Sequence, residues 1–291
     1  MAVDLQKLKR KMRGVTSTRQ VTRALQMVSA MKMRKAQEQS ERSRVYRAGL
    51  LELMASFDSP PWEAVPELAA APSGNHVMLV TYGSDRGLCG PFNSNVLSAV
   101  QHLGDEIGRE NLEIRCVGVK VGSTLRRRGF NVVSNMRRPA EVDRIVFKQE
   151  VGRLLQEDWA SGKYRMIKIL STALRGMTVL KPAIGDWLPL AGEPASASKQ
   201  EKGFAKDFID EQSSNSVFAA AIRKHLDNEI LTALMESEAA EHVARMIAMD
   251  NATRNAEELF SRLQLTFNKA RQAKITQEIC EIVSGANAIR A

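Results

Sequence analysis

Proline is missing from both ends of this 291-residue chain, and glycine is scarce there. All nine prolines lie between Pro60 and Pro194, and residues 204–284 hold neither proline nor glycine. Residues 1–59 hold only Gly14 and Gly49. Because proline and glycine disfavour a helix interior more than other residues do, their absence predicts a long helix at each end and a compact domain between them.

Cysteine and long apolar runs are also scarce. The three cysteines are odd in number and far apart in the chain, which argues against a disulfide framework and predicts reduced thiols. No segment approaches the roughly 20 consecutive apolar residues that a membrane-spanning helix needs. The first ten residues have neither an apolar core nor a cleavage site, so we expect no secretory signal.

Apolar residues recur along the C-terminal stretch at steps of three and four. They are Leu226, Ile230, Leu234, Met246, Met249, Ala252, Ala256, Leu259, Leu263, Phe267 and Ala270. This spacing predicts an amphipathic helix of roughly 100 Å with a coiled-coil seam. We expect it to pack antiparallel on the N-terminal helix, since the two ends of a middle domain usually lie close together. The predicted parts are a coiled-coil helix (1–58), a head (76–190) and a second coiled-coil helix (208–287).

The middle of the chain alternates strands with helices. Apolar runs predict strands at residues 76–82, 114–119, 130–133, 165–173 and 177–184, and helical spacing predicts helices at 93–107, 122–128 and 142–159. The last helix has a predicted apolar face of Val142, Ile145, Val146, Val151, Leu154 and Leu155. The predicted fold class is therefore α/β: a long antiparallel coiled coil plus a Rossmann-like, open, mostly parallel sheet with helices on its faces.

Positive charge is concentrated in the N-terminal helix. Residues 1–59 hold 13 Lys and Arg against 5 Asp and Glu, whereas residues 204–291 hold 10 against 13. Within the second segment, residues 259–277 carry four basic residues and no acidic one. The basic stretches predict an acidic protein partner around the helices, although a solvated charged face has the same pattern. We expect no nucleic acid as partner, because no recognised nucleic-acid motif is present.

A glycine-rich stretch, residues 83–90 (GSDRGLCG), follows the first predicted strand. A strand, a glycine loop and a helix together form the frame of a phosphate-binding turn, but this stretch has neither GxGxxG nor the Gly-Lys-Ser/Thr of a P-loop. We interpret it as a tight turn or an interface loop. The histidines are scattered and no Gly-x-Ser-x-Gly elbow is present. We therefore expect no catalytic residue, no cofactor and no metal.

Three stretches carry a family resemblance. They are residues 27–35 (MVSAMKMRK), residues 84–93 (SDRGLCGPFN), and residues 245–286, which include RMIAM, LQLTFNKARQAKITQE and EIVSGA. Together they resemble the gamma subunit of F-type ATP synthases, over nearly the whole chain. Pro91 departs from the glycine that this family usually has there.

The resemblance implies a mechanical function. The chain would be the central rotor shaft, coupling rotation of a membrane ring of c subunits, driven by protons or sodium ions, to conformational change at catalytic sites on beta subunits. Its implied partners are the alpha and beta subunits, the epsilon subunit and the c-ring. Implied contacts with the alpha/beta ring are Met27, Lys32, Arg34, Lys35, Arg271, Gln272, Thr276, Glu278, Ile279 and Ile282. The implied interface residues of the head loop are Asp85, Arg86, Gly87 and Cys89.

The resemblance also implies a location at the cytoplasmic face of a bacterial inner membrane, as a peripheral part of the complex. Two other interpretations remain open from the residues alone. One is a coiled-coil scaffold or nucleic-acid-associated protein that uses its basic helices. The other is an enzyme with a nucleotide-binding head, against which the incomplete glycine motif argues.

Overall fold

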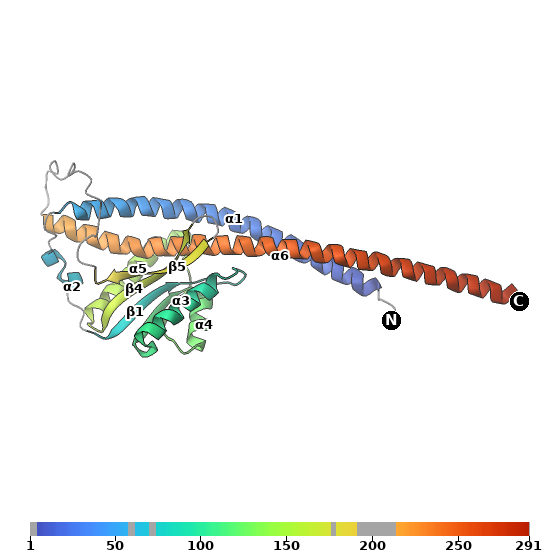
Figure 1. Ribbon diagram of the computed structural model, residues 1–291. Helices are drawn as coiled ribbons and strands as arrows, with labels where there is room; N and C mark the ends of the chain where they lie inside the picture. The colour runs from blue at the N-terminus through green and yellow to red at the C-terminus, as the bar shows by residue number, and fades with distance from the viewer. Residues whose placement is uncertain (1–4, 58–61, 70–73, 176–178, 191–213, 291) are drawn as a thin grey trace. The chain divides into compact units, whose positions relative to one another are not determined.

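The computed structural model describes residues 5–57, 62–69, 74–175, 179–190 and 214–290. The chain separates into two compact units, one formed by Met1–Ala30 with Arg245–Ala291 and the other by Met31–Ala244. Each unit contains part of the first long helix and part of the last one (Figure 1). The three domain boundaries expected from the sequence remain a prediction.

Two long helices flank the middle of the chain, as the absence of proline predicts. Helix α1 spans Leu5–Ala55 and helix α6 spans Ser214–Arg290. The first residues of the predicted second helix, 208–213, lie outside the described residues. Helix α6 continues through Gly285 to Arg290. One glycine costs a helix only about 1 kcal/mol, so by itself it does not end a long one.

Helix α1 runs without interruption through a stretch rich in threonine. Threonine is a poor helix former, but its hydroxyl can bond to the backbone of the preceding turn. Thr16 donates to the Met12 carbonyl at 3.0 Å, and Thr18 donates to the Gly14 carbonyl at 3.1 Å. These hydroxyls are therefore satisfied inside the helix, and α1 keeps its regular path there.

In the unit of Met1–Ala30 and Arg245–Ala291, α1 and α6 pack antiparallel. The hydroxyls of Thr22 and Thr253 lie 2.8 Å apart in a buried contact. Gln26 Nε2 donates to Asp250 Oδ1 at 3.0 Å. Because the partner's number falls as the number along α1 rises, the two helices run in opposite directions, as predicted.

The same antiparallel pairing holds in the unit of Met31–Ala244. Ser43 Oγ donates to Asn228 Oδ1 at 3.0 Å and lies 2.6 Å from Thr232 Oγ1, in a buried cluster. The guanidinium of Arg44 lies 2.8 Å from Glu236 Oε1 at the edge of the same contact. Polar groups and small side chains therefore make up much of this helix pairing.

The central sheet has five strands in the order β3-β2-β1-β4-β5. They are β1 (His76–Tyr82), β2 (Leu112–Val117), β3 (Asn131–Met136), β4 (Tyr164–Arg175) and β5 (Val179–Leu188). Strand β1 pairs in parallel with β2 and β4, β2 pairs in parallel with β3, and β4 and β5 form an antiparallel hairpin. The predicted open, mostly parallel sheet is confirmed, with strand bounds shifted by a few residues.

Helices cover both faces of this sheet (Figure 1). Alternate residues of β1 point to opposite faces: Met78, Val80 and Tyr82 pack with α5 (Arg144–Ala160) and α6, whereas Val77 and Leu79 pack with α3 (Phe92–Ile107) and α4 (Val119–Arg127). The remaining short elements are η1 (Trp62–Ala64), α2 (Pro66–Ala69), η2 (Arg109–Asn111) and η3 (Glu141–Asp143).

Two buried aromatic side chains tie the sheet to α6 directly. The Tyr82 hydroxyl donates to the Ile230 carbonyl at 3.0 Å, and Trp187 Nε1 donates to the Leu226 carbonyl at 3.1 Å. Buried Tyr and Trp normally find such partners, because an unpaired polar atom in the core is costly. Helix α6 is thus a structural part of the head within Met31–Ala244.

The predicted apolar face of α5 is partly wrong. Val151 and Leu155 are buried, but Val142, Ile145 and Val146 are 85%, 65% and 64% exposed. The buried face is formed at four-residue steps by Phe147, Val151, Leu155 and Trp159. The two largest of these side chains set the rotation of the helix, and Val142 precedes α5 in the 3-10 turn η3.

His225 lies in the interface between α6 and α1, where it is only 7% exposed. Burial, helped by the positive charge of Arg47, lowers the pKa of His225 to about 4. Its Nε2 is 3.9 Å from Glu229 Oε1, which is itself paired with Arg47 at 2.5 Å. The folded state therefore favours the neutral imidazole.

We expect the stability of the chain to fall as the pH drops from about 6.5 towards 4. The imidazole is neutral in both states above pH 6.5, but below it the unfolded chain takes up the proton first. The loss is about 3 kcal/mol across this window. His225→Gln should flatten this part of the profile in urea unfolding measured from pH 7.5 to 4.5. The matched control is His102→Gln, at an exposed position of α3. Parallel profiles for His225→Gln and the unchanged chain would contradict the assignment.

Candidate functional site

The head loop, residues 83–90, is a tight turn between β1 and α3 that depends on close backbone approach. A Cβ at Gly83 would lie 2.4 Å from Val121 Cγ2. Gly118 has a φ of 128°, and a Cβ there would lie 2.5 Å from the backbone of Gly83. Only glycine fits these two positions, because a side chain at Gly83 would press against α4 and one at Gly118 would push the ends of β1 and β2 apart.

Asp85 holds this loop in place through two backbone bonds. Its Oδ1 accepts from the Val119 amide at 3.0 Å, and its Oδ2 accepts from the Arg138 amide at 3.3 Å. The carboxylate therefore links the head loop to the start of α4 and to the segment after β3. A charged acceptor makes such bonds stronger than a neutral one does.

The interior of the loop is closed by its own side chains. Ser84 Oγ donates to the Arg86 carbonyl at 2.6 Å, and Asn93 Nδ2 donates to Ser84 Oγ at 2.7 Å. Cys89 is 2% exposed beneath them, with its Sγ 3.3 Å from Asn93 Nδ2. These contacts favour the interpretation of a self-supporting turn.

The exposed part of the head loop is its tip. Arg86 is exposed, and Leu88 is 66% exposed with a φ of 62°, in the left-handed region that non-glycine residues rarely adopt. Pro91 has a φ of −81° at the start of α3, which suits a proline ring. Of the predicted interface residues, Asp85 is a structural anchor, Cys89 is buried, and Arg86 and the partly exposed Gly87 lie at the surface.

The predicted contact residues on α1 are exposed. In the first unit, Met27 is 58% exposed. In the unit of Met31–Ala244, Lys32, Arg34 and Lys35 are exposed as well. Lys35 Nζ donates to Glu141 Oε2 at 2.6 Å, and this hydrogen bond holds the pKa of the Glu141 carboxyl below its usual value. Lys35 is thus in contact with the head.

The predicted contact residues near the C-terminus lie together on one stretch of α6. Residues 271–285 are all exposed, and Ile279 and Ile282 are 56% and 71% exposed. Thr276 Oγ1 donates to the Gln272 carbonyl at 3.0 Å, so these two residues are one turn apart on the same face. Arg271 and Glu278 are seven residues apart, so helical spacing places them together on another side of α6, about a third of a turn from Gln272 and Thr276. A patch of apolar side chains flanked by polar ones is typical of an interaction surface.

Sequence reasoning missed a set of buried ion pairs. Arg138 pairs with Glu241, and Arg144 pairs with Glu238, over more than 90 intervening residues. The only signal for them is that Glu238 and Glu241 are three residues apart, which places them on one face of a helix. Their partners could not be identified without the fold.

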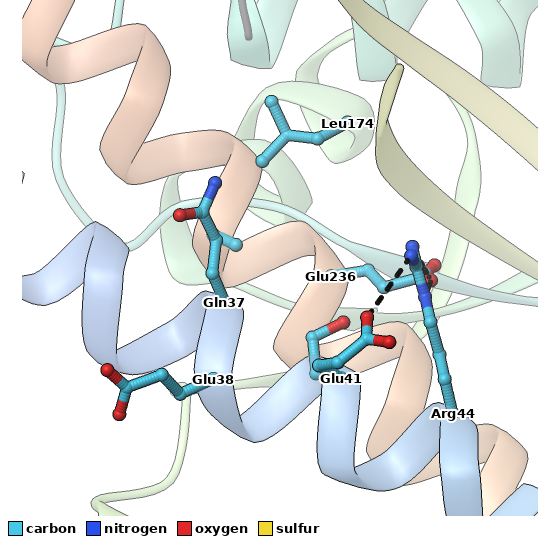
Figure 2. A pocket seen from close by; sticks show the side chains of 8 residues that line it. Gln37, Glu38, Glu41, Arg44, Leu174 and Glu236 are labelled. Carbon is cyan, nitrogen blue, oxygen red and sulfur yellow. Dashed lines mark hydrogen bonds and ion pairs between the residues drawn. The ribbon is translucent and has the colours of Figure 1, made fainter. Parts of the chain in front are cut away.

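A cavity of about 410 Å³ is lined by three elements of the unit Met31–Ala244. Figure 2 shows the side chains that line it. Helix α1 contributes Glu38, Glu41 and Arg44, α6 contributes Glu236, and β4 contributes Leu174. Arg44 lies between the carboxylates of Glu41 and Glu236, at 3.9 Å and 2.8 Å. Two of the three carboxylates here are held in surface ion pairs with Arg44, which gives the cavity a structural explanation.

Within the described part of the chain, no three His, Cys, Asp or Glu side chains are grouped as metal ligands. Among the same residues, no helix combines the length and the apolar character needed to cross a bilayer.

Comparison with known proteins identifies the family. A family model described as ATP synthase matches residues 4–289. The ATP synthase gamma chain of Pelotomaculum thermopropionicum is 36% identical over 289 residues, covering 98% of this chain and 99% of that one. The gamma chain of Chlorobium phaeobacteroides (strain BS1) is 33% identical over 294 residues, covering 98% of each chain. The chain belongs to the ATP synthase gamma family.

Solved structures share the fold. A chain of the Euglena gracilis mitochondrial ATP synthase superposes with a TM-score of 0.68 at 19% identity, covering 98% of this chain and 94% of that one. A central-stalk chain of the Tetrahymena thermophila enzyme gives a TM-score of 0.55 at 20% identity, covering 80% and 99%. As a gamma subunit, the chain is the central rotor stalk of an ATP synthase and a non-catalytic part of that complex.

We expect Asp85→Ala to destabilise the gamma subunit by about 1–3 kcal/mol, because it leaves two backbone amides without their acceptor. The measurement is urea unfolding of the purified chain, followed by circular dichroism. Asp105→Ala, at an exposed position of α3, is the control and should change the unfolding free energy by less than about 0.5 kcal/mol. Equal effects of the two substitutions would show that Asp85 does not anchor the loop.

Proposed function

We propose that this gamma subunit couples rotation of a membrane c-ring to conformational change at catalytic sites on three beta subunits. It turns inside a ring of alternating alpha and beta subunits, and the c-ring is driven by protons or sodium ions. The chain itself contributes no catalytic group. The complex lies at the cytoplasmic face of a bacterial inner membrane, where this subunit is peripheral.

The observation that carries the proposal is the exposed C-terminal end of α6. Four branched apolar side chains, Ile275, Ile279, Ile282 and Val283, are between 47% and 71% exposed there. Exposed apolar groups gathered in this way favour burial against a partner by roughly 25 cal/mol per Å². A largely apolar end with few directional bonds suits a bearing that turns inside an apolar collar.

The polar residues beside this end supply directional contacts. Arg271, Gln272, Thr276 and Glu278 are exposed and lie within two turns of α6. We assign them to bonds with the alpha/beta ring that form at some rotor angles and break at others. Lys32, Arg34 and Lys35 on α1 offer a basic surface to acidic segments of that ring. We assign the exposed, apolar Met27 to a separate packing contact with the ring.

Coupling by such a shaft requires differential binding. A rotor contact changes nucleotide affinity at a beta site only as far as it favours one beta conformation over another. Each tenfold change in that affinity needs about 1.4 kcal/mol of difference in contact energy. Because the residues of the shaft differ around its circumference, the three beta subunits meet different surfaces at any one angle.

The head supplies the other end of the coupling. We assign the head, with its loop tip at Arg86 and Gly87, to contacts with the epsilon subunit and the c-ring. The c-ring applies torque to the head through these contacts, and the helix pair transmits the torque to the alpha/beta ring. The chain's membrane association is therefore indirect, through the c-ring.

The assembly test is purification of the tagged chain from native membranes, with native mass spectrometry and an ATP hydrolysis assay. We expect one copy of this chain with three alpha and three beta subunits. Arg271→Ala combined with Gln272→Ala should lower hydrolysis at least about tenfold if the lost contacts supply 1.4 kcal/mol. Arg153→Ala, at an exposed position of α5, is the control and should leave hydrolysis unchanged. Recovery of the chain alone, or with nucleic acid and no ATPase, would refute the proposal.

The bearing is tested by Ile279→Asp combined with Ile282→Asp. Carboxylates in an apolar collar lose their hydration, so we expect ATP-driven rotation to slow at least about tenfold. The measurement is single-molecule rotation of the assembled complex. Ile279→Val with Ile282→Val keeps the apolar character and should rotate at the normal rate. Normal rotation of the aspartate variant would contradict the proposed bearing.

A further inference from the structure

A short segment after β3, residues 137–144, carries two arginines that both reach α6. Arg138 pairs with Glu241 and Arg144 pairs with Glu238. The two glutamates are three residues apart, so they lie on one face of α6. None of the four side chains is more than 19% exposed. The contact is therefore largely out of water, unlike an ordinary surface ion pair.

Arg138 connects the head loop with α6 through a single side chain. Its Nη1 lies 2.7 Å from Glu241 Oε2, and its Nη2 donates to the Gly83 carbonyl at 2.6 Å. Its backbone amide donates to Asp85 Oδ2 at 3.3 Å. The loop is thus held at Gly83 and Asp85 by the same residue that is held by Glu241.

Arg144 extends this contact to α1. Its guanidinium bonds to Glu238 of α6 and to the side-chain oxygen of Gln39. Gln39 Nε2 and Lys35 Nζ each donate to Glu141 at 2.6 Å. Burial opposes ionisation of Glu238, but a hydrogen bond from His242 and the positive charges of Arg144 and Arg138 hold the pKa of Glu238 below its usual value.

The geometry of arginine gives its bond to the Gly83 carbonyl a fixed direction, and charge attraction holds the same side chain to Glu241. A guanidinium is planar and always charged, and its donors point in fixed directions. Apolar packing, which also joins the sheet to α6, has no such directionality. Separating the two partners of a buried pair leaves an uncompensated charge. The pair therefore strongly disfavours movement of the segment 137–144 along α6. The hydrogen bond to Gly83 and the ion pair with Glu241 together therefore add an angular constraint that the apolar core does not supply.

We propose that Arg138 is a positioning residue that fixes the angle of the head loop against α6. Its two-sided contact, to Gly83 and to Glu241, makes the loop tip turn with the helix rather than lag behind it. The inference rests on the proposed rotor function for its purpose, but the positioning itself concerns contacts inside this chain. Arg144 supports the same segment from α1.

The first test measures loop opening directly, by the reaction of Cys89 with a small maleimide in the assembled complex. The exposed Cys280 is replaced in all variants by Cys280→Ser, and the buried Cys116 is the internal reference. With Arg138→Gln we expect labelling of Cys89 relative to Cys116 to rise about tenfold, because the loop opens more often. Glu241→Gln should also raise the labelling of Cys89 relative to Cys116. Arg138→Lys keeps one of the two contacts at a time, so its labelling ratio should lie between those of the unsubstituted chain and Arg138→Gln.

The matched control is the ion pair of Arg115 and Asp158. It is similarly buried, at 12% and 16% exposure, with a shortest distance of 2.8 Å, but it joins β2 to α5 inside the head. Arg115→Gln should leave the ratio of Cys89 to Cys116 labelling unchanged. An equal rise for Arg115→Gln and Arg138→Gln would reduce Arg138 to a general stabilising residue and overturn the proposal.

The second test measures the angular constraint in the rotating complex. A bead is attached to the head through Ser98→Cys, at an exposed position of α3. Arg138→Gln should widen the variance of bead angles during pauses about twofold, since the head is held less stiffly. Unchanged variance would overturn the positioning role. If the unsubstituted chain itself joins no rotating complex, the proposed function fails, and the labelling ratio measured on the purified full chain still decides the role of Arg138. Should Arg138→Gln fail to assemble, Glu241→Gln is measured in both tests, and an unchanged result there would overturn the proposal.

Discussion

Ser43 of α1 meets Asn228 and Thr232 of α6 in a buried cluster of hydrogen bonds. Buried polar groups have to find their partners, so a shift of one helix along the other would break these bonds and leave costly unpaired atoms. In the other unit, the paired hydroxyls of Thr22 and Thr253 impose the same condition. The register of the two helices, and with it the position of every exposed residue along them, depends on these contacts.

Small side chains make this pairing possible. Every seventh residue of α1 is buried from Thr22 to Leu50, through Ser29, Ala36 and Ser43. Four of these five are small, so the helix backbones can approach each other closely, and the period of seven is that of a coiled coil. The stability of the pairing thus comes from close contact and specific hydrogen bonds more than from large apolar groups.

Much of the fold could be predicted from local patterns. The absence of proline located both long helices, and alternating strands and helices gave the mostly parallel sheet. The apolar face of α5 was only partly predictable, because Phe147 and Trp159 outweigh Ile145 and Val146 in setting which side is buried. Apolar spacing alone does not rank competing faces of a helix. A residue's volume and its fit in the core decide between them.

The candidate site also has a part that could be predicted from the sequence and a part that could not. The exposed residues near 27–35 and 271–282 stand out as sequence motifs, and the fold leaves them at the surface. The pairing of Arg138 with Glu241 carries no such signal, because the partners are about a hundred residues apart and many arginines could fill the role. Long-range charge pairing is a property of the folded chain that local reasoning does not reach.

The uncovered apolar end of α6 has a consequence for how the cell handles this protein. Ile275, Ile279, Ile282 and Val283 form an exposed apolar surface. Surfaces of this kind are what chaperones and proteases recognise in unfinished folds. Surplus copies would then aggregate or be degraded unless a partner covers this end soon after synthesis. Synthesis in step with the other subunits is therefore a requirement set by the exposed apolar side chains at one helix end.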